Sequence, residues 1–188
     1  MNIVFVSGSV VGTKTRRAIT ELKKVWLKQD AAAQIEIIDL KALKLPFCDG
    51  RHFLDYEEDV VATLKKVVEA DVVVFGTPVF QASIPGSLKN FFDLLPQDAL
   101  RETVTGIVVT AGSSKHYLMA EQHLKPILSY MKAVVVSTYV YILAEDFVGN
   151  DLVKDDVDLR LARLAEDLIF TTEAKRYIQK KQEEAYGF

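Results

Sequence analysis

Short apolar runs alternate along the chain with longer segments whose apolar residues recur at helical spacing. Five of these runs are predicted as strands, at residues 3–7, 35–40, 71–76, 104–110 and 134–142. Amphipathic spacing and boundary signals predict helices over residues 16–28, 55–70, 85–95, 115–132 and 154–184. The run at 71–76 is β-branched and lacks polar alternation, so we expect it to be a central strand buried on both faces.

This order of elements predicts an α/β fold in three layers. Strands that alternate with helices form a parallel sheet, because right-handed crossovers place helices on both of its faces. The sequence contains no internal repeat and no low-complexity linker. We therefore expect one domain over residues 1–188, with residues 154–184 as a C-terminal helical extension.

Composition narrows the class of protein. The 188 residues carry a formal net charge of −3, so we expect no nucleic-acid surface. No segment approaches the roughly 20 apolar residues that span a bilayer, so we expect no membrane insertion. The N-terminus has no basic lead and is predicted as a core strand rather than a signal peptide. A single cysteine, Cys48, forms no internal disulfide, and we expect a cytoplasmic location.

The first candidate ligand loop follows the first predicted strand. Ligands of parallel sheets bind beyond the carboxyl ends of the strands. Residues 8–15 read G-S-V-V-G-T-K-T, and glycines beside a helix N-terminus favour an anion. A P-loop requires G-x-x-x-x-G-K-S/T and a dinucleotide fingerprint requires G-x-G-x-x-G, so the spacing excludes both. Asp39, at the end of the second strand, is nevertheless where a ribose-binding acid would lie in a dinucleotide-binding fold.

Two further loops fall at the same predicted edge of the sheet. Residues 77–86 follow the central strand, where Pro78 stiffens the chain and Phe80 offers an apolar surface for a flat ring. Residues 110–116, after the fourth strand, are mostly small and permit close approach of the backbone to a ligand. Together the three loops predict one pocket with an anion-binding end and a flat apolar end.

These residues resemble the NAD(P)H-dependent FMN reductases. The resemblance rests on Gly8-Ser9 with Thr13 and Thr15, and on residues 77–93, which match T-P-x-Y/F-x-x-x-x-P-G-x-L-K-N-x-x-D. Residues 110–114, His116 and Leu124-Lys125-Pro126 further resemble the branch that supplies reduced flavin to sulfonate monooxygenases. The resemblance covers roughly residues 2–143. It implies a flavodoxin-like fold with a five-stranded parallel sheet in the order 2-1-3-4-5.

The resemblance also implies which residues bind FMN. Those expected to hold its phosphate are Ser9, Thr13, Lys14 and Thr15. Those expected to line its ring are Pro78, Val79, Phe80 and Gln81. Those expected to meet the pyrimidine edge of the ring are Thr110, Ala111, Gly112, Ser113 and Ser114.

Two positions depart from the family pattern. Many members carry an arginine near Val11, so cationic help here must come from Lys14 or Arg16. In the sulfonate-associated branch the fourth helix often bears an inserted tyrosine linked to the release of flavin as a substrate. Residues 120–124 read A-E-Q-H-L, without a tyrosine. Both alternatives, a resident FMN and a released one, therefore stay open.

The chemistry implied is hydride transfer from NADPH or NADH to N5 of FMN, with the protein supplying position and electrostatics. We therefore nominate no catalytic acid or base, and neither His116 nor His123 is given a direct role. The three histidines and Cys48 lack metal-ligand spacing, so no metal is expected.

The resemblance leaves the acceptor and the assembly open. Flavin, quinone, azo compounds and chromate are alternative acceptors, and a partner monooxygenase is one destination for released FMN. An electron-carrier flavodoxin is a rival from another class, although such proteins tend to be more acidic than a charge of −3. A non-redox anion-binding module is another. Residues 85–95 are apolar enough to reach a second subunit, so we expect a homo-oligomer, either a dimer or a tetramer.

Overall fold

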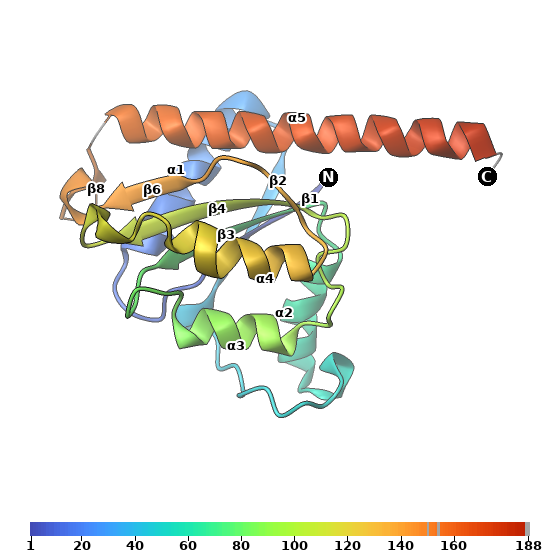
Figure 1. The fold of residues 1–188 in the computed structure, drawn as a ribbon, viewed down its shortest axis with the longest axis horizontal. Helices are drawn as coiled ribbons and strands as arrows, with labels where there is room; N and C mark the ends of the chain where they lie inside the picture. The colour runs from blue at the N-terminus through green and yellow to red at the C-terminus, as the bar shows by residue number, and fades with distance from the viewer. Residues whose placement is uncertain (150, 154, 187–188) are drawn as a thin grey trace.

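A parallel sheet forms the centre of the molecule (Figure 1). The structure, a computed structural model, describes residues 1–149, 151–153 and 155–186. The strands of the sheet are β1 (Asn2–Ser7), β2 (Gln34–Asp39), β3 (Val72–Pro78), β4 (Val104–Ala111), β5 (Val134–Val135) and β6 (Val140–Leu143). Their order is β2-β1-β3-β4-β5, with β6 also paired to β4, and every pair is parallel. The predicted fold and strand order are confirmed.

Helices cover both faces of this sheet (Figure 1). The five α-helices are α1 (Lys14–Gln29), α2 (Glu58–Val68), α3 (Gly86–Leu94), α4 (Lys125–Tyr130) and α5 (Asp155–Tyr186). One core cluster packs α1 and α5 against residues such as Phe5, Val74 and Val108. The other packs α2, α3 and α4 against residues such as Val6, Phe75 and Val109. Alternate residues of the same strands thus serve opposite layers, which is why these strands lack polar positions.

The fifth strand differs from the prediction. Residues 134–142 form two short strands, β5 and β6, instead of one. Val104 pairs with Val134, whereas Val108 pairs with Val140, so two extra residues lie between the paired segments. The polar Ser137 and Thr138 occupy this excursion and are exposed. Because the insertion is an even number, Val140 and Ile142 still face the core.

The fourth helix is also not the single element predicted over 115–132. A 3₁₀ turn (Ser114–His116) and a π-helical turn (Ala120–Leu124) precede α4. Pro126 lies in the first turn of α4, where it lacks an N–H group and its ring crowds the carbonyl one turn earlier. A wider turn upstream, with the N–H of Lys125 donating to the Ala120 carbonyl, accommodates that loss.

Other boundaries shift modestly. Helix α1 begins at Lys14, and α2 begins at Glu58 after a 3₁₀ turn over Phe53–Asp55. Pro85 caps α3 instead of lying inside its first turn. The sequence also gave no sign of the hairpin β7 (Phe147–Val148) and β8 (Asp151–Leu152), which follows β6.

Helix α5 is the longest element, at 32 residues, and it runs past the end of the sheet (Figure 1). Its later turns are attached to the sheet at the end where the parallel strands begin. There Lys175 and Gln179 contact Glu102, and Arg176 lies 3.0 Å from the carboxylate of Asp71. Among the helices of the described ranges, none is long and apolar enough to cross a membrane.

Candidate active site

A cavity of about 400 Å³ opens where β1, β3, β4 and β6 end. Four connecting segments line it, and each follows a strand of the sheet. The lining residues are Ser9, Val11, Gly12, Thr13, Lys14, Thr15, Pro78, Val79, Phe80, Thr110, Ala111, Gly112, Ala144 and Phe147. This is the edge at which parallel sheets bind their ligands.

The loop after β1, called here the phosphate loop (residues 8–13), is held tightly at its base. The Gly8 N–H donates to the Gly76 carbonyl at 2.7 Å, which joins the ends of β1 and β3. A side chain at Gly8 has no room, because its Cβ would lie 2.8 Å from that same carbonyl oxygen. Further along, the Ser9 hydroxyl donates to the Val11 carbonyl at 2.6 Å and accepts from the Val11 N–H at 3.3 Å. Gly12 then takes a φ of +71°, which turns the chain into α1.

Lys14 and a pair of hydroxyls line the cavity where α1 begins and β4 ends. The Lys14 ammonium donates to the Ala144 carbonyl at 3.3 Å and lies 5.4 Å from the centre of the Phe147 ring. Thr15 and Thr110 share a hydrogen bond of 2.7 Å between their hydroxyls, and both side chains are buried. This end of the cavity therefore combines positive charge with polar hydrogen-bonding groups.

An apolar part of the cavity wall is built on the loop after β3. Pro78, Val79 and Phe80 line it, and the Val79 N–H donates to the Thr110 carbonyl at 3.1 Å. Phe80 and Ser83 exchange two backbone hydrogen bonds of 2.9 Å. The residues between them, Gln81 and Ala82, have φ angles of +47° and +60°. These values define a tight turn of the I′ type, which normally carries glycine or asparagine.

That turn yields a prediction about stability. Replacing Ala82 with glycine should raise the free energy of unfolding by about 0.5–1 kcal/mol, because the left-handed strain is larger than the entropy that glycine adds to the unfolded chain. Chemical denaturation measures this change. As a control, Ala174→Gly at an exposed position inside α5 should lower stability by about 1 kcal/mol. Equal losses from both variants would contradict the strain at Ala82.

The cavity collects most of the predicted site residues but not all of them. Ten line it, namely Ser9, Thr13, Lys14, Thr15, Pro78, Val79, Phe80, Thr110, Ala111 and Gly112. Gln81, Ser113 and Ser114 lie outside its lining. The Ser113 carbonyl instead accepts a hydrogen bond of 2.7 Å from the Tyr141 hydroxyl, and burial raises the pKa of that phenol.

Sequence reasoning missed two contributors on the segment after β6. Ala144 and Phe147 line the cavity, and both contact the Lys14 ammonium. Their position directly after the last predicted strand was the available signal, because the carboxyl end of that strand lies at the same edge of the sheet. A fifth strand predicted to run only to residue 142 gave no reason to include them.

The predicted non-participants also have defined places. The Ser83 hydroxyl and Nδ1 of His123 are 3.1 Å apart, which connects the tight turn to the π-helical turn. The Cys48 thiol donates to the Asp93 carbonyl and does not line the cavity. Within the described residues, no group of three or more acidic, histidine or cysteine side chains is placed to hold a metal ion.

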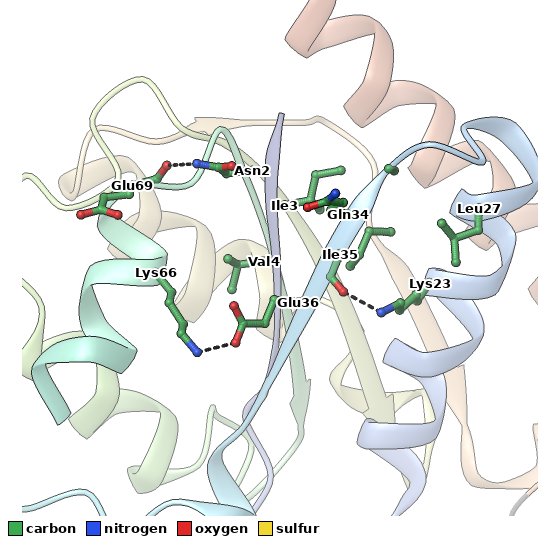
Figure 2. Close-up of a pocket in the computed structure, with 11 residues that line it drawn as sticks. Asn2, Ile3, Val4, Lys23, Leu27, Gln34, Ile35, Glu36, Lys66 and Glu69 are labelled. Carbon is green, nitrogen blue, oxygen red and sulfur yellow. Dashed lines mark hydrogen bonds and ion pairs between the residues drawn. The ribbon is translucent and has the colours of Figure 1, made fainter. Parts of the chain in front are cut away.

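A larger hollow, of about 660 Å³, lies at the other end of the sheet (Figure 2). It surrounds the beginnings of β1 and β2, where Lys23 donates to the Ile35 carbonyl at 2.6 Å and Lys66 pairs with Glu36. Lys23 thereby occupies a backbone carbonyl of β2, the edge strand of the sheet, and charged side chains on an edge strand oppose pairing with another chain. The hollow is therefore a feature of the sheet edge, remote from the strand ends that form the 400 Å³ cavity.

The strand order, the loop at the first strand end and the half-polar, half-apolar cavity together define a flavodoxin-like α/β protein. The sequence profile of the NADPH-dependent FMN reductases matches residues 1–147, so the chain belongs to that family. It is an oxidoreductase that uses FMN with a reduced nicotinamide as hydride donor. The predicted family, activity and cofactor are confirmed.

Individual relatives agree over most of the chain. The NAD(P)H-dependent FAD/FMN reductase of Geobacillus thermodenitrificans is 40% identical over 174 residues, covering 90% of this chain and 92% of that protein. The NADH-dependent FMN reductase SfnE of Pseudomonas putida is 30% identical over 141 residues, covering 75% and 76%. The solved apo structure of the NADH:FMN oxidoreductase EMOB superposes with a TM-score of 0.76 at 26% identity, over 90% of this chain and 88% of that one.

Proposed function

We propose that the 400 Å³ cavity is where this chain binds FMN and reduces it with NADPH or NADH. The observation that carries the proposal is the division of the cavity into a polar end at the phosphate loop and an apolar end at Pro78 and Phe80. FMN has the same division, with a charged phosphate at one end and a flat ring system at the other. On this proposal residues 1–188 act as a single FMN-binding domain.

The polar end fits the phosphate of FMN. The N-terminus of α1 lies at the end of the phosphate loop, and its dipole favours negative charge there. We assign phosphate contacts to Ser9, Thr13, Lys14 and Thr15, with Lys14 as the cation that takes the place of the family arginine near Val11.

The apolar end fits the ring. Pro78, Val79 and Phe80 offer flat contact surface, and Gln81 carries the strained turn that holds Phe80 in place. The backbone from Thr110 to Ser114 is assigned to the pyrimidine edge. Ala111 and Gly112 have small side chains and lie at the cavity wall, which lets the main chain approach closely. Bound FMN supplies N5 as the hydride acceptor, and the described residues supply position and exclusion of water.

The later fate of the electrons is part of the proposal. The SfnE and SfnF relatives are named FMN reductases, and another relative is named an FMN-dependent NADH:quinone oxidoreductase. We propose free flavin or a quinone-type compound as the acceptor, with a monooxygenase as the partner that receives released FMN.

We also propose a cytoplasmic enzyme. A groove of about 520 Å³ between α3 and α4, with Phe92 and Tyr130 in its lining, supports assembly into a homo-oligomer.

One experiment tests the reductase function. The protein is purified, saturated with FMN and mixed with NADPH or NADH in the absence of oxygen. Oxidised flavins absorb at roughly 450 nm. We expect this absorbance to bleach within seconds, at a rate that depends on the protein. Free FMN with the same nicotinamide and no protein is the control.

The outcome separates the alternatives. No bleaching with either nicotinamide would reject the reductase and favour an electron carrier or a non-redox anion-binding module. After bleaching, free FMN, a quinone, an azo dye and chromate are offered in turn as acceptors. Reduction of many equivalents of free FMN per protein supports release of reduced flavin, whereas reoxidation of a single bound flavin by a quinone, an azo dye or chromate supports a resident flavin.

A further inference from the structure

A second, smaller cavity lies behind the phosphate loop, separate from the 400 Å³ cavity. Its volume is about 220 Å³, and it opens between the ends of β1 and β2. It shares Ser9, Gly12 and Thr13 with the larger cavity, so one loop separates the two. Its remaining lining consists of Ser7, Arg16, Asp39 and Lys41.

Two polar groups in this lining are buried without a partner. Ser7 is fully buried, and its hydroxyl has no hydrogen-bond partner among the described residues. The Nη1 atom of Arg16 is likewise buried and unpaired within the described chain. Buried polar groups nearly always find a partner, and leaving one unpaired costs about 1–3 kcal/mol, more for a charged group. These two groups therefore point to a ligand that accepts hydrogen bonds.

The charges favour an anion. Arg16 and Lys41 bring two positive charges, against one carboxylate from Asp39. That carboxylate is already occupied, because one oxygen lies 3.3 Å from Nε of Arg16 and the other accepts from the Lys41 N–H at 3.2 Å. Asp39 thus positions the Arg16 guanidinium, whose Nη1 atom stays without a partner among the described residues. The Lys41 ammonium donates to the Gly12 carbonyl at 3.4 Å, on the phosphate loop itself.

The other nearby cation is directed elsewhere. The Lys14 ammonium contacts Ala144 and Phe147, which line the larger cavity and not the smaller one. The two sides of this loop therefore carry separate positive groups, Lys14 on one side and Arg16 with Lys41 on the other. A guanidinium with a free end suits a phosphate group, because its planar set of N–H donors can bond two phosphate oxygens at once.

We propose that this cavity binds a terminal phosphate monoester of a nucleotide that the enzyme uses, with Arg16 and Ser7 as its hydrogen-bond donors. Two such groups occur in the reaction, the 2′-phosphate of NADPH and the 5′-phosphate of FMN. The first would make Arg16 a determinant of NADPH preference over NADH. The second would place the flavin phosphate behind the loop rather than inside it. The inference rests on the proposed function for its choice of ligands.

The test compares ligand pairs that differ by that one phosphate. Calorimetric titration of the flavin-free protein with 2′,5′-ADP and with 5′-ADP measures how much the 2′-phosphate of NADPH contributes to binding. Quenching of flavin fluorescence by the protein, with FMN and with riboflavin, reads the cofactor phosphate. The variants are Arg16→Gln and Ser7→Ala, and the control is Lys44→Gln, an exposed lysine outside both cavities.

We expect Arg16→Gln to weaken the phosphate-bearing member of one pair about 10- to 100-fold and its phosphate-free partner less than about twofold. Ser7→Ala should act in the same direction while leaving the melting temperature unchanged or higher, since it removes an unpaired buried hydroxyl. This second variant keeps the test valid if Arg16→Gln folds poorly. Lys44→Gln should change neither pair.

The two pairs identify the source of the phosphate. A loss confined to 2′,5′-ADP, with kcat/KM for NADPH falling and that for NADH retained, identifies the donor phosphate. A loss confined to FMN identifies the cofactor phosphate. Unchanged affinity for all four ligands, or equal losses within each pair, overturns the proposal. Failure of the reductase function is a different result: neither NADPH nor NADH would bleach the flavin bound to the wild-type protein. The calorimetric titrations involve no turnover, so they test the phosphate site independently of that result.

Discussion

Replacing Gly8 with alanine should lower the free energy of unfolding by about 1–3 kcal/mol and weaken FMN binding at least about tenfold. The new Cβ would lie 2.8 Å from the Gly76 carbonyl oxygen and 2.9 Å from Cδ2 of Leu88. Leu88 is able to move, but the carbonyl belongs to β3 and already accepts the Gly8 N–H. Relief therefore requires the phosphate loop to shift away from the sheet. Denaturant titration and a flavin fluorescence titration measure the two effects.

Gly86→Ala is the matched control for this substitution. Gly86 begins α3, and apart from its chain neighbours and the backbone of its own helix no heavy atom of the described residues lies within 4 Å of a Cβ built there. Because alanine favours a helix over glycine, this variant should be as stable as the wild type or slightly more stable. If Gly8→Ala behaved like Gly86→Ala in both titrations, the close approach of β1 to β3 would not constrain the site.

Thr15→Val should cost about 1–3 kcal/mol of unfolding free energy, and so should Thr110→Val. Each single change leaves the other hydroxyl of the 2.7 Å pair buried without its partner. The double variant removes both hydroxyls and should be close to the wild type in stability. Thermal or denaturant unfolding of all four proteins gives the interaction energy as a double-mutant cycle.

A flavin titration of the double variant separates the effect on FMN binding from the effect on stability. If Thr15 contacts the phosphate, the double variant stays folded but binds FMN more weakly than the wild type. Thr172→Val controls for the loss of a buried hydroxyl, since Thr172 donates to the Leu168 carbonyl inside α5 and leaves no orphaned donor behind. Additive losses in the double variant would show that the two hydroxyls do not depend on one another.

The parts of the fold that sequence predicted are those set by local patterns. The β-branched run of β3 has no polar residue to present to water, so only a central position in the sheet satisfies it. The glycine at Gly8 and the helical spacing after Thr13 likewise located the first loop. The family motif at residues 77–93 then supplied the ligand, which no spacing argument by itself identified.

What escaped prediction depends on contacts between distant segments. The break between β5 and β6 arises from pairing with β4, whose register is invisible in residues 134–142 taken alone. Phe147 enters the cavity only because the chain turns back through the β7–β8 hairpin. Gln81 and Ala82 have positive φ angles although neither is a glycine or an asparagine, so the sequence does not signal their turn and the surrounding structure imposes it.

The closed hydrogen bonds of Ser9 bear on how tightly a flavin is held. Its hydroxyl is already satisfied twice by Val11 of the same loop, as donor and as acceptor. A phosphate that recruits this hydroxyl gains only the difference between the new bond and the one it displaces, and it must also rearrange the backbone at Val11. The rearrangement of the loop therefore offsets part of the binding free energy of the phosphate, and the loop regains its own hydrogen bonds when the phosphate dissociates. If the phosphate of FMN uses this hydroxyl, the loop favours exchange of the flavin over its retention.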